Sequence, residues 1–169
     1  MRRRWLVIGG GGLVALAVLV GLIVFVAGLV SGGSNTNQAQ NKEYTVGEPA
    51  SLNDRVLTVN EVQHNFVPSS TERPQQGNEF IWVNITLANT SSSAIDVNPL
   101  DFWVQDPNGV QRNAEPIQQV TDALNNPGTV AAHETLNGNL AFQVSQGAMN
   151  LKLVYKPHTF SGDTITVDL

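Results

Sequence analysis

The sequence offers few residues from which a catalytic nucleophile and its base could be assembled. Its three histidines are His64, His133 and His158, cysteine is absent, and the Gly-x-Ser-x-Gly motif of many serine hydrolases does not occur. Each histidine lies in a segment that we expect to be a loop, where an imidazole normally faces solvent. The sequence therefore predicts no catalytic residues and no enzymatic activity.

The densest run of oxygen ligands contains Asp96, Asn98 and Asp101. Carboxylates placed this closely can bind calcium or, as a pair, hydrolyse a glycosidic bond. The spacing differs from that of an EF-hand loop, however, and Asn98-Pro99 is typical of a turn in which Asp101 bonds backbone amides. We therefore interpret the run as structural. Because the lack of cysteine also excludes thiolate zinc and iron–sulfur sites, we predict no metal and no cofactor.

Three aromatic residues occupy strand positions where a polar side chain is expected. Phe80 and Trp82 alternate with the aliphatic residues of the segment 79–89, and Trp103 alternates with its apolar neighbours. Both tryptophans should then point away from the core, which allows them to share one sheet face. Phe80, Trp82 and Trp103 are the candidate partner-binding patch. The alternative is that the loop 64–78 or the preceding tether covers them as a second small core.

The N-terminus has the pattern of a membrane anchor. Arg2 to Arg4 precede 26 residues without a charge, Trp5 to Val30, and the part from Leu13 onward alone would form about 27 Å of helix. By the positive-inside rule, residues 1–4 are cytoplasmic and everything after Val30 is outside. We predict an uncleaved single-pass transmembrane helix over residues 5–30. A cleaved signal peptide, followed by secretion, is the alternative.

The segment after the anchor, residues 31–42, is polar and rich in Gly, Ser, Asn and Gln, which predicts a flexible tether. Of the nine basic residues in the chain, three lie before the anchor, which leaves six against 14 acidic ones beyond it and a net charge of −8 there. An acidic exposed part without a basic stripe argues against nucleic acid as a partner. The only membrane contact that we expect is through the N-terminal helix.

The remainder of the chain, residues 43–169, alternates apolar and polar residues in short runs bounded by Gly, Pro, Asn and Asp. The pattern predicts strands at 55–62, 79–89, 102–105, 110–113, 135–144, 151–155 and 164–169. Residues 114–128 are predicted to be a loop with one helical turn. Seven to eight short strands, each with one apolar face, predict one all-β domain built as an antiparallel two-sheet sandwich.

Several short segments of this domain also match a known family in the family's order. They are Tyr44-Thr45-Val46-Gly47, Leu57-Thr58-Val59-Asn60, Gly77-Asn78-Glu79-Phe80 with Asn84, Thr86 and Asn89, Pro99-Leu100-Asp101-Phe102 with Asp106 to Gly109, Gly138-Asn139-Leu140-Ala141-Phe142-Gln143-Val144, and Leu151-Lys152-Leu153-Val154-Tyr155-Lys156-Pro157. The series resembles small bacterial extracytoplasmic domains of unknown function, lipid-anchored or membrane-anchored, that are related to the immunoglobulin-like secreted antigen of mycobacteria.

The resemblance covers Tyr44 to Leu169 and implies an immunoglobulin-like sandwich outside the membrane, with no activity and no catalytic residue to transfer. Many members of that family carry a lipid-modified cysteine, which this chain lacks. We therefore predict a non-enzymatic extracytoplasmic module, tethered to the cell membrane, that interacts with a protein or senses a small ligand. A structural or accessory protein of the cell envelope is the alternative, and an enzyme is the third and least favoured one.

Overall fold

The regular secondary structure of the described residues is almost entirely β-strand. The computed structural model describes residues 42–68, 72–117, 122–158 and 162–169. The strands in these ranges are β1 (Glu43–Thr45), β2 (Ala50–Leu52), β3 (Arg55–Gln63), β4 (Asn78–Asn89), β5 (Ile95–Val97), β6 (Phe102–Gln105), β7 (Gln111–Asn113), β8 (Gly128–Val130), β9 (Thr135–Ser145), β10 (Lys152–Tyr155) and β11 (Ile165–Asp168). One 3-10 turn, η1 (Pro99–Asp101), precedes β6. The prediction of an all-β fold is confirmed.

The prediction of seven to eight strands is wrong, because β1, β2, β5 and β8 lie outside the predicted ranges. Each of the four has three residues, which is too short a run to show alternation in the sequence. The long strands follow the predicted ranges closely. β4 begins one residue earlier than predicted, and β6 has the predicted bounds.

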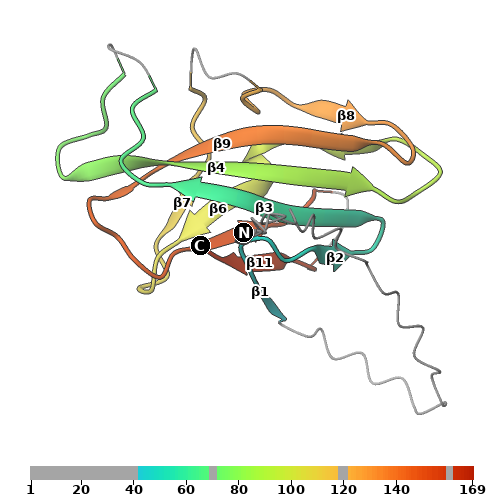
Figure 1. Cartoon of the computed structure of the whole chain (residues 1–169), viewed down its shortest axis with the longest axis horizontal. Coiled ribbons are helices and arrows are strands. Elements are labelled where there is room, and N and C mark those ends of the chain that lie inside the picture. Colours follow the sequence, from blue (N-terminus) through green and yellow to red (C-terminus); the bar gives the residue numbers. More distant parts are fainter. Residues whose placement is uncertain (1–41, 69–71, 118–121, 159–161) are drawn as a thin grey trace, which may run out of the picture. The chain divides into compact units, whose positions relative to one another are not determined.

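Two sheets face each other. One has the strand order β1-β11-β10-β6-β7, in which β1 runs parallel to β11 and every other pair is antiparallel. The other is antiparallel throughout, with the order β2-β3-β4-β9. A separate two-stranded antiparallel pair is formed by β5 and β8. Figure 1 shows β3, β4 and β9 as one layer, with β6, β7 and β11 in the layer behind it.

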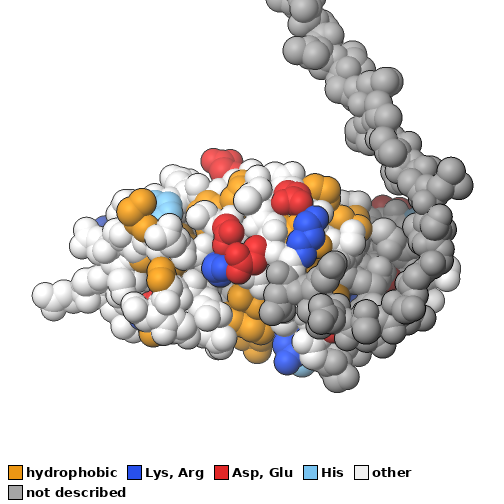
Figure 2. Space-filling view, turned by 90° about the horizontal axis from the view of Figure 1, so that it is seen from below, with side chains coloured by type: hydrophobic (Ala, Val, Ile, Leu, Met, Phe, Trp, Pro, Cys, Tyr) orange, Lys and Arg blue, Asp and Glu red, His pale blue; other side chains and the backbone are white. Residues whose placement is uncertain are grey.

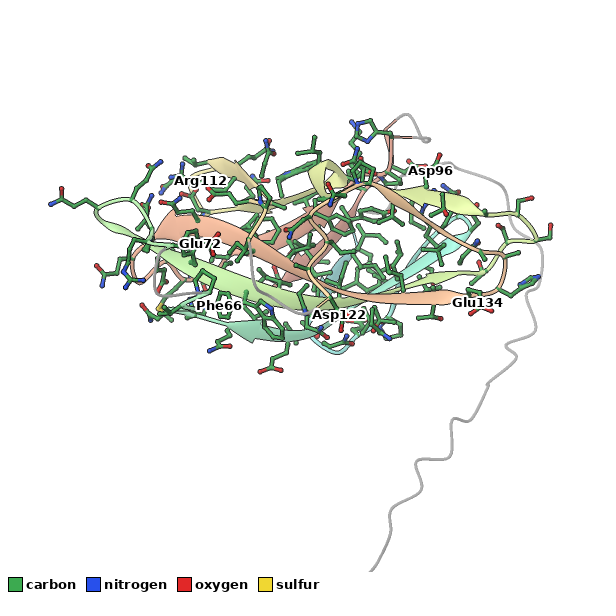
Figure 3. The ribbon with its side chains drawn as sticks, turned by 90° about the horizontal axis from the view of Figure 1, so that it is seen from above. Phe66, Glu72, Asp96, Arg112, Asp122 and Glu134 are labelled. Atoms are coloured by element: carbon green, nitrogen blue, oxygen red, sulfur yellow. The ribbon has the colours of Figure 1, made fainter. Side chains whose placement is uncertain are left out.

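The core lies between these two sheets. The aliphatic residues at 81, 83, 85 and 87 of β4 are fully buried, as the period of two predicts. From the other sheet, Phe102 and Tyr155 stack with their ring centroids 4.5 Å apart. Side chains from both layers fill the interior (Figure 3). Burial of each large side chain stabilises the fold by about 1.5–3 kcal/mol.

The segment 114–128 crosses the outer edge of β9. Glu115 forms an antiparallel bridge with Ala141, and Ala123 forms a parallel bridge with Asn139. The centre of the segment, 118–121, lies outside the described residues, so the predicted helical turn is not tested there. The crossing supplies Ile117 to the outer side of the sheet, where it is buried.

The predicted cytoplasmic residues 1–4, the predicted anchor 5–30 and the tether up to residue 41 also lie outside the described residues. Within the part of the chain that the structure describes, no helix has the length and apolar character needed to cross a bilayer.

Candidate functional site

Phe80 and Trp82 point away from the core, as predicted. Phe80 is 6% exposed and forms a small cluster with Ile117 and Ala141, against which Phe66 packs. Phe66 also lies beside Trp82, with the ring centroids 6.3 Å apart and the planes tilted by 32°. It follows β3 and lies against the outer side of the four-stranded sheet (Figure 3). The beginning of the loop 64–78 therefore covers Phe80, which makes this part of the face a second small core.

Trp103 lies elsewhere. It projects from β6 on the face opposite to Phe102, between Val154 of β10 and Asn113 of β7. Because β6 pairs with β10 and β7 and not with β4, Trp82 and Trp103 belong to different sheets. The expectation that the two indoles share a sheet face is wrong. Phe80, Trp82 and Trp103 therefore do not form one continuous patch. Each of the two indoles is half-buried.

All three histidines are exposed, as predicted, but two of them contact a buried carboxylate. His64 Nδ1 lies 3.2 Å from Glu79 Oε1, and His158 Nδ1 contacts Asp101 Oδ1. Both acids are about 97% buried, since Glu79 and Asp101 are each 3% exposed. His133 lies in the turn before β9, in the left-handed region with φ of 60°. The two histidine–carboxylate contacts were not predicted from the sequence.

The oxygen-rich run before β6 is a turn, as its Asn-Pro sequence predicts. Asn98 accepts a hydrogen bond from the amide of Leu100 at 3.0 Å and caps η1. The Asp101 side chain contacts His158, whereas the sequence predicts hydrogen bonds from local backbone amides. Asp96, Asn98, Asp101 and His158 line a recess of about 310 Å³. Among the described residues, no group of three or more metal-ligating side chains forms.

A recess of about 400 Å³ lies near the edge formed by β1, β11 and β10. Its lining contains two lysines, Lys42 and Lys152, and two acids, Glu43 and Asp106. Lys152 contacts Glu43 and also Asp168 beside the recess. The first of these contacts is the main reason that the pKa of Lys152 is raised above its ordinary value. Figure 2, which views the domain from below, shows acidic and basic side chains adjoining one another on this side. The lining of this recess is therefore formally neutral overall.

A second recess of about 400 Å³ lies at the end of the sandwich, and we call it the end pocket. Its volume is in the range of small-molecule sites. The residues that line it are His64, Asn65, Glu79, Gly147, Ala148, Met149, Asn150, Leu151 and Leu169. They come from both sheets, because Glu79 belongs to β4 of one sheet while Leu169 follows β11 of the other. The end pocket thus opens between the sheets where the core ends.

Glu79 is the chemically unusual residue of the end pocket. Its Oε1 accepts a hydrogen bond from the Gly147 amide at 3.3 Å and contacts the imidazole of His64. Its Oε2 is buried and has no hydrogen-bond partner among the described residues. Burial of a carboxylate oxygen without a donor costs free energy. The arrangement therefore has unused capacity to accept a hydrogen bond.

Local structure around Glu79 follows from the strand ends. The turn after β9 is closed by a bond from the Ala148 amide to the Ser145 carbonyl at 3.0 Å, with Gly147 in the left-handed region at φ of 70°. This turn aims the Gly147 amide at Glu79. Another part of the lining is fixed by the Leu169 amide, which donates to the Leu151 carbonyl at 2.9 Å. Both parts of the lining are therefore held by backbone hydrogen bonds.

The sequence contains a signal for this site. Side chains alternate between the two faces of a strand, so Glu79 shares a face with the buried aliphatic residues at 81, 83, 85 and 87 of β4. The alternation therefore places its carboxylate on the core side. Glu79 is not among the site residues that the sequence predicts. The signal for the site is an acidic residue at the end of a strand, on the face that is otherwise apolar.

Comparisons with known proteins agree with the fold. The profile of a family described as "Domain of unknown function (DUF4352)" matches residues 44–165. The yjhA protein from Bacillus subtilis is similar in structure, with a TM-score of 0.59 at 20% identity over 75% of this chain and 98% of that one. An uncharacterised β-sandwich protein from Clostridium difficile has a TM-score of 0.52 at 13% identity, over 81% and 99% of the two chains.

A mycobacterial protein is similar in structure as well. MPT63, a secreted protein from Mycobacterium tuberculosis, has a TM-score of 0.54 at 11% identity, over 78% of this chain and 100% of that one. Likeness at these identities concerns the fold alone. No protein of curated function matches the sequence significantly. The predicted resemblance is thereby confirmed for the domain and its β-sandwich fold.

Proposed function

We propose that this chain, which belongs to the DUF4352 family, is a non-enzymatic extracytoplasmic binding module that an N-terminal helix holds at the membrane. The observation that supports binding is the end pocket. It has the volume of a small-ligand site, apolar walls and one buried carboxylate with an oxygen that no described residue bonds. Such convergence of a few polar groups in an apolar recess is typical of binding sites.

The proposed location is supported by the sequence. Three arginines precede 26 uncharged residues, and the polar tether that follows would let the domain stand free of the bilayer. One neighbour of similar fold, MPT63, is described as secreted. Protease added to intact cells should remove the domain, while residues 1–30 remain with the membrane. Protection of the domain from the protease would reject the proposed orientation, and a mature N-terminus after Val30 would make the protein secreted.

Binding is tested by nuclear magnetic resonance of the full chain in lipid nanodiscs, titrated with a set of small cationic, neutral and anionic compounds. At least one class should shift the backbone amide signals of Gly147 and Leu151, which both line the end pocket. The indole N–H signals of Trp82 and Trp103 report the earlier candidate patch in the same spectra. If only an indole N–H signal shifts, the binding site lies at that tryptophan and not in the end pocket. A spectrum that no compound changes would favour the structural or accessory role.

A further inference from the structure

We propose that the end pocket binds a primary ammonium group attached to a short apolar chain. This inference rests on the proposed binding function and specifies its ligand class. It depends on three observations: the buried carboxylate of Glu79, the apolar residues around it, and the charges of the residues that line the recess.

The carboxylate of Glu79 supplies the recognition of positive charge. Two donors, the His64 imidazole and the Gly147 amide, contact Oε1, and the described residues provide none for Oε2. The terminal torsion of a glutamate is broad, so a partial rotation can turn the unbonded Oε2 toward the recess that Glu79 lines. An oxygen with free acceptor capacity then faces the recess beside His64, which is 44% exposed. An ammonium donor at this position makes a charge-assisted bond in a poorly solvated site.

The walls supply the recognition of an apolar chain. Leu151 is 2% exposed and Leu169 is half-buried, and both lie against the core. Met149 is 75% exposed at the rim, and its unbranched side chain can adapt to ligands of different shape. Asn65 and Asn150 are also exposed lining residues that can bond water or a polar ligand tail. A volume of about 400 Å³ accommodates a chain of a few carbon atoms.

The charge balance excludes the opposite ligand class. Among the described residues that line the end pocket, Glu79 is the sole acid, and lysine and arginine are absent. Apart from His64, the side chains that line the end pocket carry one negative charge, that of Glu79. A carboxylate or phosphate ligand would lie near Glu79 without a fixed cation to offset the repulsion. A neutral alcohol could bond Glu79 but would lack the charge-assisted part of the interaction.

Three probes of equal chain length separate these possibilities: n-butylammonium, 1-butanol and butanoate. Each is titrated into the full chain in nanodiscs near neutral pH, and the amide signals of Gly147 and Leu151 are followed. We expect butylammonium to bind about ten times more tightly than butanol, and butanoate to bind more weakly than either. Glu79→Gln should weaken butylammonium binding about tenfold or more and leave butanol binding within about twofold.

The matched control is Glu134→Gln. Glu134 is an exposed acid that precedes β9, while the end pocket lies after β9, an 11-residue strand that separates them by about 35 Å. This variant should bind butylammonium like the natural chain. A second pocket variant, Met149→Ser, changes an exposed side chain that folding does not require, and it should weaken butylammonium binding by about threefold.

The outcomes are decisive even where Glu79→Gln fails to fold, because the three probes are compared on the natural chain. Equal or tighter binding of butanol or butanoate at Gly147 and Leu151 overturns the inference and leaves the proposed binding function standing. Equal loss of affinity in Glu79→Gln and Glu134→Gln overturns the role of Glu79. If no probe and no member of the wider compound set shifts these signals, both the inference and the proposed function fail.

Discussion

Trp82 and Trp103 lie on the outward faces of two different sheets, so the thickness of the sandwich separates the two indoles. Each therefore has its own neighbours and contributes independently to stability. Trp82 lies next to Phe66 on the four-stranded sheet. Trp103 is flanked by β10 and β7 on the five-stranded sheet, and its buried indole nitrogen lacks a hydrogen-bond partner among the described residues.

Trp82→Ala should destabilise the domain. The half-buried indole packs beside Phe66, and its removal exposes part of the small cluster around Phe80. We expect a loss of about 2 kcal/mol and a fall in the melting temperature of roughly 5 to 10 °C, measured by circular dichroism. Val67→Ala, at a residue that is 69% exposed, is the control and should have little effect. An unchanged melting temperature in Trp82→Ala would return this indole to a binding role.

Gly138→Ala should also destabilise the domain, through steric conflict with the segment that crosses β9. A Cβ atom at this position would lie 2.5 Å from Leu124 Cγ, and the Leu124 amide is held by the Asn139 carbonyl at 2.9 Å. Overpacking of this kind costs about 1–3 kcal/mol. Chemical denaturation should show that Leu124→Ala in the same chain recovers part of the loss.

The control for this pair is Gly128→Ala, because a Cβ atom there meets no atom within 4 Å and the backbone is not in the left-handed region. Its unfolding free energy should stay within about 0.5 kcal/mol of that of the natural chain. If the losses of unfolding free energy in Gly138→Ala and Leu124→Ala simply add in the double variant, Leu124 does not pack over Gly138 of β9 as described.

How far the sequence predicts the fold depends on the length of each strand. β4 has 12 residues, and its strict alternation determines its bounds, its buried face and the outward direction of Trp82. β1 has three residues, and among the described strands its partner is β11, which comes far later in the sequence. Three residues carry no usable period, and a pairing between strands so far apart in the sequence depends on tertiary structure. The sequence alone therefore does not reveal it.

The candidate site is less predictable than the fold, because it depends on which strand ends meet. The alternation of side chains along β4 is enough to place Glu79 on the core side of that strand. Its contacts come from His64 before it in the chain and Gly147 long after it, and no local pattern connects these residues. Trp103 illustrates the same limit. Its outward direction follows from alternation, but the sheet to which it belongs follows from the pairing of β6 with β10.

Asn89→Ala should be among the most damaging polar substitutions. The side chain is 2% exposed and joins the end of β4 to two loops. Its Nδ2 donates to the carbonyls of Ser93, Val130 and Ala131 at 2.7, 3.1 and 2.9 Å, and its Oδ1 accepts from the amide and hydroxyl of Ser91. Truncation leaves several buried groups without partners, so we expect a loss of about 3 kcal/mol or more by urea unfolding.

Asn137→Ala is the control for this substitution. Asn137 is exposed on β9 and accepts a hydrogen bond from the Thr86 hydroxyl at 2.8 Å. Its loss should cost less than about 1 kcal/mol. If Asn89→Ala is as mild as this control, the network around Asn89 does not hold the loops together in solution.

Alkaline pH should destabilise the domain through Tyr155. Burial raises the pKa of this phenol above its ordinary value of 10.0, although the nearby Arg55 guanidinium opposes the rise. Above about pH 10 the unfolded chain releases the proton more readily than the folded one, so the stability present at lower pH is lost as the pH rises. The pKa of Lys152 is raised as well, chiefly by Glu43, and it changes stability in the same direction at still higher pH.

Tyr155→Phe isolates the tyrosine contribution, because it keeps the ring that stacks on Phe102 and removes the ionisable group. Unfolding free energies at about pH 8.5 and about pH 11 should fall steeply with pH for the natural chain and less steeply for Tyr155→Phe. The slope that remains in the variant includes the contribution of Lys152, which Lys152→Met should reduce further. Equal slopes in the natural chain and Tyr155→Phe would show that the folded domain ionises Tyr155 as readily as the unfolded chain does.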